Sequence, residues 1–218
     1  MDYWEYAEEL QLIETQNNVE QDLYNVIIRL LKQIEGLNKY SIRDISGRRR
    51  TVSGSEKPYW GIKGFPDIAI LDKSDGNNIF VPATTKDIHA VVEVKALGKS
   101  LDTIDCIRQL TGHLLSFGRV IHTNGYVWRF YDLDLSHYKL EKKYNEDYTY
   151  DIRGNSKESD AKWKMVNTFL DQLVQLHDDN NPEDIWKPYA KVDLKNNEQS
   201  EYDKLVKELD KLGKKMRT

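Results

Sequence analysis

The chain has 218 residues, of which 39% are hydrophobic, 31% charged and 11% aromatic, with 32 Lys and Arg against 36 Asp and Glu. This length fits one domain with extensions, and the composition supports an ordinary hydrophobic core and excludes global disorder. The net charge of −4 would argue against a nucleic-acid partner if it were spread evenly along the chain, but it is not.

Local features exclude several classes of protein. No stretch approaches eighteen consecutive apolar residues, so we expect no membrane span. Residues 1–22 contain seven acids and no Lys or Arg, which is the opposite of a secretory signal. Cys106 is the only cysteine, which rules out an internal disulfide and a multi-cysteine zinc site. We therefore expect a cytoplasmic protein with no membrane partner.

The N-terminal part of the chain is predicted to be helical. Residues 4–13 predict a short acidic helix. Apolar residues then recur at intervals of three and four, which predicts a second, partly buried helix that ends at Gly36. Asn18 is its expected N-cap, with Gln21 completing a pair that resembles a capping box. We interpret residues 1–17 as an acidic extension that precedes the core.

Residues 39–64 form a basic block. They contain seven bases and two acids, a net charge of +5. Alternation around Tyr40, Ile42 and Ile45 predicts a strand, and the stretch from Val52 onward predicts a loop. Such a local charge can neutralise phosphates even on an acidic protein, although an exposed hairpin without a ligand is the alternative. The candidate nucleic-acid contacts are Arg48, Arg49, Arg50 and Lys63.

Two apolar strands and a helix follow the basic block. Residues 65–71 predict a short strand, and residues 88–94, which are rich in β-branched side chains, predict a central one. Residues 101–117 have the apolar spacing of a helix, with Asp102 as the expected N-cap and Gly118 as the stop signal.

A hairpin is predicted next. Residues 120–123 and 126–131 read as two short strands joined at Asn124-Gly125, the strongest hairpin signal in the chain. We place the core at residues 18–135. This order of elements predicts an α/β fold in which helices flank a mixed central sheet.

Residues 136–218 are interpreted as a helical C-terminal extension packed on the core. Within them we expect a peripheral hairpin at residues 138–150 and a long helix around residues 163–177. A last helix is predicted over residues 199–214, with a narrow apolar stripe made by Leu205, Leu209 and Leu212.

One group of residues carries chemistry. Asp67 lies within one expected strand, and Glu93 and Lys95 lie at the end of the next. Alternate side chains of a strand share a face, so Glu93 and Lys95 point the same way, and Asp67 meets them if the strands are neighbours. Two close carboxylates repel each other unless a divalent cation lies between them, and oxygen ligands suit Mg²⁺. A lysine beside such a metal can hold or deprotonate a water, which indicates hydrolysis of a phosphodiester.

These motifs resemble those of the PD-(D/E)XK nuclease superfamily. The match consists of Pro66-Asp67 and the segment Glu93-Val94-Lys95 after an apolar strand. Glu20, on the predicted second helix, sits where many members carry an additional glutamate.

The following segment is similar to the nuclease domain at the N-terminus of type I restriction enzyme motor subunits. There, a helix that contains Gln is followed by a strand, a Thr-Asn-Gly turn and an aromatic strand, as Gln109 and residues 122–131 are here. The resemblance covers residues 20–132, roughly half of the chain.

The resemblance implies a restriction-endonuclease-like fold that hydrolyses DNA with Mg²⁺, for which Mn²⁺ can substitute. It implies that Asp67, Glu93 and the backbone carbonyl of Val94 bind the metal. It also implies that Lys95 positions the attacking water and that Glu20 acts through a metal-bound water.

The chain departs from the family pattern at two points. Gln109 would belong to a Gln-X-X-X-Tyr motif, but the fourth residue after it is His113, a candidate to replace the tyrosine hydroxyl. The chain also lacks a Walker-type phosphate-binding loop, so it has no helicase motor of its own. The implied partners are DNA and, beyond it, a second copy of the chain or a separate translocase or specificity subunit.

Other interpretations stay open. Asp67 can be a turn acid, Glu93 and Lys95 a surface pair, Glu20 a carboxylate that favours the helix dipole, and Gln109 a polar surface residue. The alternative function is a catalytically inactive restriction-endonuclease-like module that binds nucleic acid or a protein partner. A third possibility is an interaction protein whose acidic N-terminus docks on a basic partner.

Overall fold

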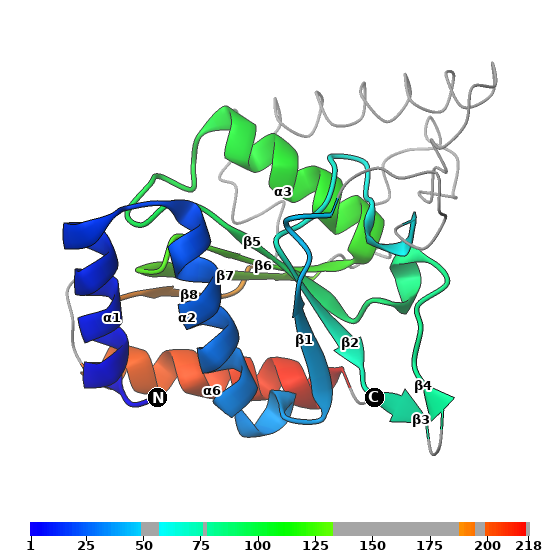
Figure 1. The fold of residues 1–218 in the computed structure, drawn as a ribbon, viewed down its shortest axis with the longest axis horizontal. Coiled ribbons are helices and arrows are strands. Elements are labelled where there is room, and N and C mark those ends of the chain that lie inside the picture. Colours follow the sequence, from blue (N-terminus) through cyan, green and yellow to red (C-terminus); the bar gives the residue numbers. More distant parts are fainter. Residues whose placement is uncertain (49–56, 76–77, 133–187, 195–198, 217–218) are drawn as a thin grey trace.

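The computed structural model describes residues 1–48, 57–75, 78–132, 188–194 and 199–216. They form a mixed six-stranded sheet with helices on both of its faces (Figure 1), which confirms the expected α/β architecture. Four features expected from the sequence lie outside the described residues: the hairpin at residues 138–150, the helix around residues 163–177, Arg49 and Arg50. No helix among the described residues is both long enough and apolar enough to cross a membrane.

The strand order of the sheet is β1-β2-β5-β6-β7-β8. The strands are β1 (Tyr40–Asp44), β2 (Ile68–Asp72), β5 (Ala90–Val94), β6 (Arg119–Thr123), β7 (Val127–Asp132) and β8 (Pro188–Asp193). Strands β5 and β6 run parallel, whereas the other neighbours are antiparallel. The parallel pair is connected through helix α3 (Ile104–Phe117), as a crossover connection requires. A separate small ribbon pairs β3 (Ser74–Asp75) with β4 (Asn78–Ile79).

Helices cover the two faces of the sheet with different partners. Helix α3 packs on one face, where Val91 of β5 joins Leu110 and Leu114 in one apolar cluster. Helices α1 (Tyr3–Gln16), α2 (Glu20–Gln33) and α6 (Gln199–Lys215) contribute to the cluster on the other face, which contains Val92. Every residue of β5 is buried, because this central strand is covered on both faces.

Helix α1 is part of this packing. The sequence interpretation set residues 1–17 apart as an extension; in the structure, Tyr3, Tyr6, Leu10 and Ile13 are buried in the same cluster as α2 and the sheet. The hydroxyl of Tyr6 also donates a 2.7 Å hydrogen bond to the carbonyl of the hairpin residue Gly125.

Leu10→Ala is therefore expected to destabilise the protein by about 2 to 5 kcal/mol, the usual cost of deleting a buried leucine side chain. Leu10 is 2% exposed, whereas Leu12 on the same helix is 41% exposed. Leu12→Ala is the matched control and should change the free energy of unfolding by less than about 0.5 kcal/mol. Urea unfolding of the two variants measures the difference. Equal destabilisation would show that the helix does not pack as described.

The start of α2 corrects one expectation. The N-cap is Val19, with no capping side chain, and the helix begins at Glu20. Asn18 was the expected cap, but its side-chain amide lies 3.5 Å from the carbonyl of Leu97, in the segment that follows β5. A long-range partner replaces the local one, and the capping pair with Gln21 does not form.

The start of α3 corrects a second expectation about helix capping. Thr103, not Asp102, caps the helix, with its hydroxyl accepting from the backbone N–H of Cys106. Asp102 instead pairs with Arg129 of β7. The helix stops at Gly118 as expected, because Gly118 adopts a φ of +86°, which is strained for other residues.

The rest of the described chain contains one confirmed turn and one strand that the sequence did not predict. Strands β6 and β7 form the expected hairpin, with Gly125 at a φ of +85° in the connecting turn. Strand β8 pairs with β7 at the edge of the sheet. Helix α6 matches the expected last helix, with Leu205, Leu209 and Leu212 buried.

Candidate active site

The site lies where β2 begins and β5 ends. These strands are antiparallel, and Ile68 pairs with Val92, so the residue before β2 comes beside the end of β5. The sequence predicted that Asp67 lies inside the strand, but in the structure it directly precedes β2. Its backbone N–H still donates to the carbonyl of Val92. The backbone N–H of Val94 donates to Oδ2 of Asp67 at 2.7 Å. This contact fixes Asp67 against the strand that carries Glu93 and Lys95.

Asp67 is held from both sides and is largely buried. Its other oxygen, Oδ1, accepts a 2.8 Å hydrogen bond from the hydroxyl of Tyr24 on α2. Burial and the negative charge of Glu93 raise the pKa of Asp67 to about 8, although the hydrogen bonds from Val94 and Tyr24 act in the opposite direction. The Asp67 side chain is thus placed where a second carboxylate disfavours its ionised form.

Glu93, in β5, and Lys95, which directly follows the strand, form a buried ion pair between Glu93 Oε1 and Lys95 Nζ. Burial disfavours the ionised Glu93, but the neighbouring His113 and Lys95 outweigh burial and lower its pKa. Burial likewise disfavours the charged Lys95, but Glu93 outweighs it and raises the pKa of Lys95. Lys95 also donates a 2.8 Å hydrogen bond to Oε1 of Gln109 on α3. Both groups are therefore charged at neutral pH.

Glu20 reaches the same edge from the first turn of α2. Its Oε2 accepts a 3.0 Å hydrogen bond from the backbone N–H of Ala96, just beyond Lys95. Its Oε1 lies 3.1 Å from the hydroxyl of Tyr24, which also contacts Asp67. Tyr24 thus links the carboxylates of Glu20 and Asp67. Tyr24 was not among the site residues predicted from the sequence; the available signal was its position four residues after Glu20, which places both on one helix face.

A layer of buried histidines lies behind Glu93. Nε2 of His113 lies 3.0 Å from Oε2 of Glu93, within ion-pair distance. His122 lies beside Glu93 on the neighbouring strand, where burial lowers its pKa to about 3, so it is neutral at pH 7. Within the described part of the chain, the ring nitrogens of His122 have no hydrogen-bond partner. His113 therefore contacts the site from the position where the family motif has tyrosine.

The candidate nucleic-acid contacts are placed in part. Lys63 crosses α3 at Gly112, where an added Cβ would lie 2.2 Å from Lys63 Cγ, so Gly112 makes room for this lysine one turn after Gln109. Arg48 is half-buried, with its guanidinium carbon 4.2 Å from the centre of the Tyr59 ring. Two aromatic residues of the hairpin have structural positions: Trp128 is fully buried, and Tyr126 donates a hydrogen bond to Glu14 of α1.

The residues fit a hard divalent cation. Asp67 and Glu93 offer carboxylate oxygens, and Val94 lies between Glu93 and Lys95 at the same edge. A cation would offset the repulsion between Asp67 and Glu93 that raises the pKa of Asp67. Among the described residues, no three His, Cys, Asp or Glu side chains form a ready-made metal cluster. Two carboxylates and a main-chain oxygen, completed by water, are the kind of ligand set that Mg²⁺ accepts.

Comparisons of the chain with protein-family models, with curated proteins and with solved structures gave no match.

Proposed function

We propose that the protein is a Mg²⁺-dependent nuclease of the PD-(D/E)XK type that hydrolyses DNA phosphodiester bonds. The observation that carries the proposal is the meeting of Asp67, Glu93 and Lys95 at one edge of the sheet. Glu20 and Gln109 reach this edge from helices on opposite faces of the sheet. An α/β sheet with this polar edge supports a restriction-endonuclease-like fold.

Asp67, Glu93 and the carbonyl of Val94 would hold the metal ion. When bound, Mg²⁺ polarises a phosphoryl oxygen and makes a bound water more acidic. Lys95 would hold the attacking water, since its ammonium group is fixed by Glu93 and Gln109 at this edge. Because Lys95 is charged at neutral pH, it is suited to donate to that water or to the phosphate oxygens.

The proposed substrate is DNA, and Lys63 and Arg48 are its proposed contacts near the site. The site itself is acidic, so cations outside it must offset the repulsion between its carboxylates and a phosphate backbone.

Cleavage of four DNA forms tests the proposed function. Purified protein is incubated with supercoiled, linear, single-stranded and branched DNA in Mg²⁺, Mn²⁺ or EDTA. We expect cleavage of at least one form with either metal and none in EDTA. DNA binding without cleavage in any metal would instead identify the catalytically inactive module.

Tyr24→Phe tests the link between the two carboxylates. The variant keeps the ring but removes the hydroxyl that contacts Asp67 and Glu20. We expect cleavage to slow by about tenfold and stability to change by about 0.5 to 1.5 kcal/mol, the net value of a typical hydrogen bond.

Tyr6→Phe is the matched control for this prediction. It also removes one buried tyrosine hydroxyl, the one that donates to the carbonyl of Gly125, but it leaves Glu20, Asp67 and Glu93 unchanged. Its stability cost should be similar and its cleavage rate should equal that of the wild-type protein. Equal cleavage rates in the two variants would exclude a role of Tyr24 in positioning Asp67.

A further inference from the structure

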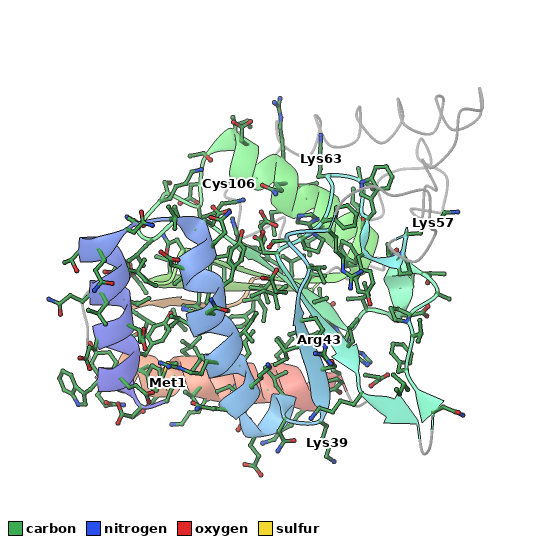
Figure 2. All side chains as sticks on the ribbon, in the orientation of Figure 1. Met1, Lys39, Arg43, Lys57, Lys63 and Cys106 are labelled. Carbon is green, nitrogen blue, oxygen red and sulfur yellow. The ribbon has the colours of Figure 1, made fainter. Side chains whose placement is uncertain are left out.

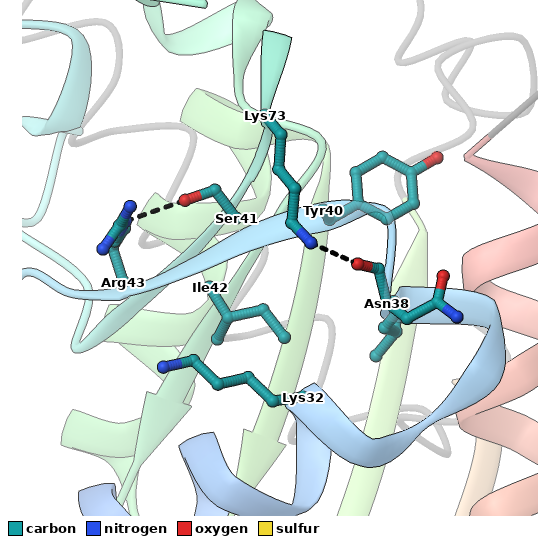
Figure 3. A pocket seen from close by; sticks show the side chains of 8 residues that line it. Lys32, Asn38, Tyr40, Ser41, Ile42, Arg43 and Lys73 are labelled. Atoms are coloured by element: carbon teal, nitrogen blue, oxygen red, sulfur yellow. Dashed lines mark hydrogen bonds between the residues drawn. The ribbon is translucent and has the colours of Figure 1, made fainter. Parts of the chain in front are cut away.

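A second polar feature lies at the free edge of β1. A pocket of about 320 Å³ opens there (Figure 3). Its lining residues are Lys32, Leu37, Asn38, Tyr40, Ser41, Ile42, Arg43 and Lys73. Three of these are cations and none is acidic, so among the described residues the pocket wall carries a formal charge of +3.

The cations come from three different elements. Lys32 belongs to the last turn of α2, Arg43 to β1, and Lys73 follows β2 directly. Both Ile42 and Arg43 line the pocket although consecutive residues of a strand point to opposite faces, so the pocket extends around the edge of β1. In Figure 3 Arg43 and Ser41 lie on one side of β1, whereas Ile42 and the side-chain end of Lys32 lie on the other.

These charges are not neutralised by carboxylates within the described part of the chain. Arg43 donates through Nε to Ser41 Oγ at 2.7 Å, which leaves its two terminal NH₂ groups for a ligand. Lys73 donates to the main-chain carbonyl of Asn38, and no described ion pair includes Lys32, Arg43 or Lys73. Three like charges that share one pocket repel each other, and a phosphate group would relieve this repulsion.

The adjacent acids have partners elsewhere. Asp44, next to Arg43, accepts from the backbone N–H and the hydroxyl of Ser46. Asp72, next to Lys73, lies 3.0 Å from Nε2 of His89. Neither of these two acids therefore forms an ion pair with a cation of the pocket.

The pocket lies beside β1, and the chain that follows β1 contacts Asp67 of the candidate active site. The N–H of Ile45 donates to the carbonyl of Asp67, so Arg43 is two residues, or about 7 Å, further along β1. Tyr40 pairs with Asp72 at the far end of the same strand, about 17 Å from Ile45. One strand of duplex DNA advances about 3.4 Å per nucleotide, so the separation corresponds to a few nucleotides.

We propose that this pocket binds a backbone phosphate of a nucleic-acid strand a few nucleotides from the candidate active site. The position relative to a cleaved bond rests on the proposed function, whereas the binding itself does not. Further cations lie outside the pocket: Figure 2 labels Lys39 near the bottom of the view, Lys57 at the right and Lys63 near the top. Arg43 belongs to the basic block of residues 39–64, whose net charge is +5, and such a block suits a polymer with repeated phosphates better than a single small anion.

Binding of an 18-base-pair duplex in EDTA tests the proposal without cleavage. The pocket variant carries Lys32→Gln, Arg43→Gln and Lys73→Gln. The matched control carries Lys204→Gln, Lys207→Gln and Lys211→Gln, which removes the same charge from exposed positions of α6. Fluorescence anisotropy gives Kd for both variants and the wild-type protein between 50 and 200 mM salt.

We expect the pocket variant to bind at least about tenfold more weakly at 100 mM salt than the control. The slope of log K against log salt should become less steep by about 1 to 3, because each phosphate contact contributes about 0.9. Equal affinities of the pocket variant and the control would overturn the proposal. Thermal unfolding verifies that both variants fold. If the triple pocket variant does not fold, the single variant Lys32→Gln, at an exposed position, replaces it in the same affinity comparison.

Two further outcomes separate this proposal from others. Free phosphate is distinguished by competition: 1 mM inorganic phosphate should not displace the duplex, and full displacement would overturn the assignment to a nucleic-acid backbone. Failure of the proposed function has a different signature. If the wild-type protein cleaves no DNA, the proposed nuclease function is refuted. If duplex affinity is nevertheless lost in the pocket variant and kept in the control, the proposed phosphate-binding pocket is supported.

Discussion

The Asp67→Asn variant is expected to lose about a thousandfold in cleavage rate and yet to be more stable than the wild-type protein at pH 9 in EDTA. The loss of activity follows if Asp67 is a metal ligand, because charge stabilisation by the metal is worth several kcal/mol and about 4 kcal/mol corresponds to a thousandfold. The gain in stability follows from the surroundings of the carboxylate.

Asparagine can keep the hydrogen bonds that Asp67 makes. Its oxygen can accept from the N–H of Val94, and its NH₂ group can donate to the hydroxyl of Tyr24, which is free to rotate. The amide thus resembles the protonated acid, the form that burial and the charge of Glu93 favour. The variant is expected to fold normally.

The pH dependence has a definite sign. The folded-state pKa of Asp67, about 8, lies above its ordinary value of 3.8, so the folded protein binds more protons than the unfolded chain between these pH values. The contribution of Asp67 to stability is therefore present below about pH 4 and is lost as the pH rises to about 8. The amide has no such loss.

Thermal unfolding in EDTA at pH 5, 7 and 9 measures this effect. The difference in Tm between Asp67→Asn and the wild-type protein should increase with pH. Adding Mg²⁺ should stabilise only the wild-type protein, since a ligand that binds the folded state raises its stability. A constant difference across the pH series would contradict the description of Asp67 as a carboxylate that is disfavoured in its ionised form.

Lys95→Met is expected to destabilise the protein by about 3 to 5 kcal/mol and to abolish cleavage. Lys95 is 7% exposed and Glu93 is 1% exposed, so removal of the ammonium group leaves a buried carboxylate without its closest cation. Breaking a buried ion pair from one side costs this amount, whereas replacing both partners costs much less.

The double variant Glu93→Gln, Lys95→Met therefore separates stability from catalysis. Its free energy of unfolding should exceed the value expected from adding the two single effects by about 1 to 3 kcal/mol. Cleavage should remain absent in all three variants. Denaturant unfolding and cleavage assays measure the two quantities. Additive stability effects would contradict a coupled pair, and full activity of the double variant would refute the assignment of the site.

Local signals in the sequence were sufficient for much of the fold. Gly118 and Asn124-Gly125 mark backbone conformations that few other residues adopt, so the end of α3 and the hairpin could be predicted. The β-branched residues within 88–94 identified the central strand, because such side chains favour extended backbone. Such features depend on the neighbours of a residue in the chain.

Features that depend on distant partners could not be predicted. Strand β8 starts with a proline and is defined by its pairing with β7, more than fifty residues earlier. Asn18 and Asp102 are good N-cap residues, but each side chain has a partner in another element. In these cases tertiary contacts outweigh a local preference of about 1 kcal/mol.

In the candidate site, too, features set by neighbours in the chain could be predicted, whereas features set by distant partners could not. The two-residue spacing of Glu93 and Lys95 predicted their shared face, and the strand patterns predicted that Asp67 could lie near them. The contact of Tyr24 with Asp67 and that of His113 with Glu93 join residues of different elements. Their roles became visible only with the helices in place. The pocket beside β1 likewise combines residues from three elements.

Cleavage of supercoiled plasmid by the wild-type protein and by Glu93→Gln, purified in parallel, tests whether Glu93 belongs to a metal-dependent nuclease site. Glutamine has the size of glutamate but lacks the charge that would bind a metal. We expect nicking by the wild-type protein in Mg²⁺, no nicking in EDTA, and a rate at least about a thousandfold lower for the variant. Equal rates for the two proteins would refute a role of Glu93 in cleavage.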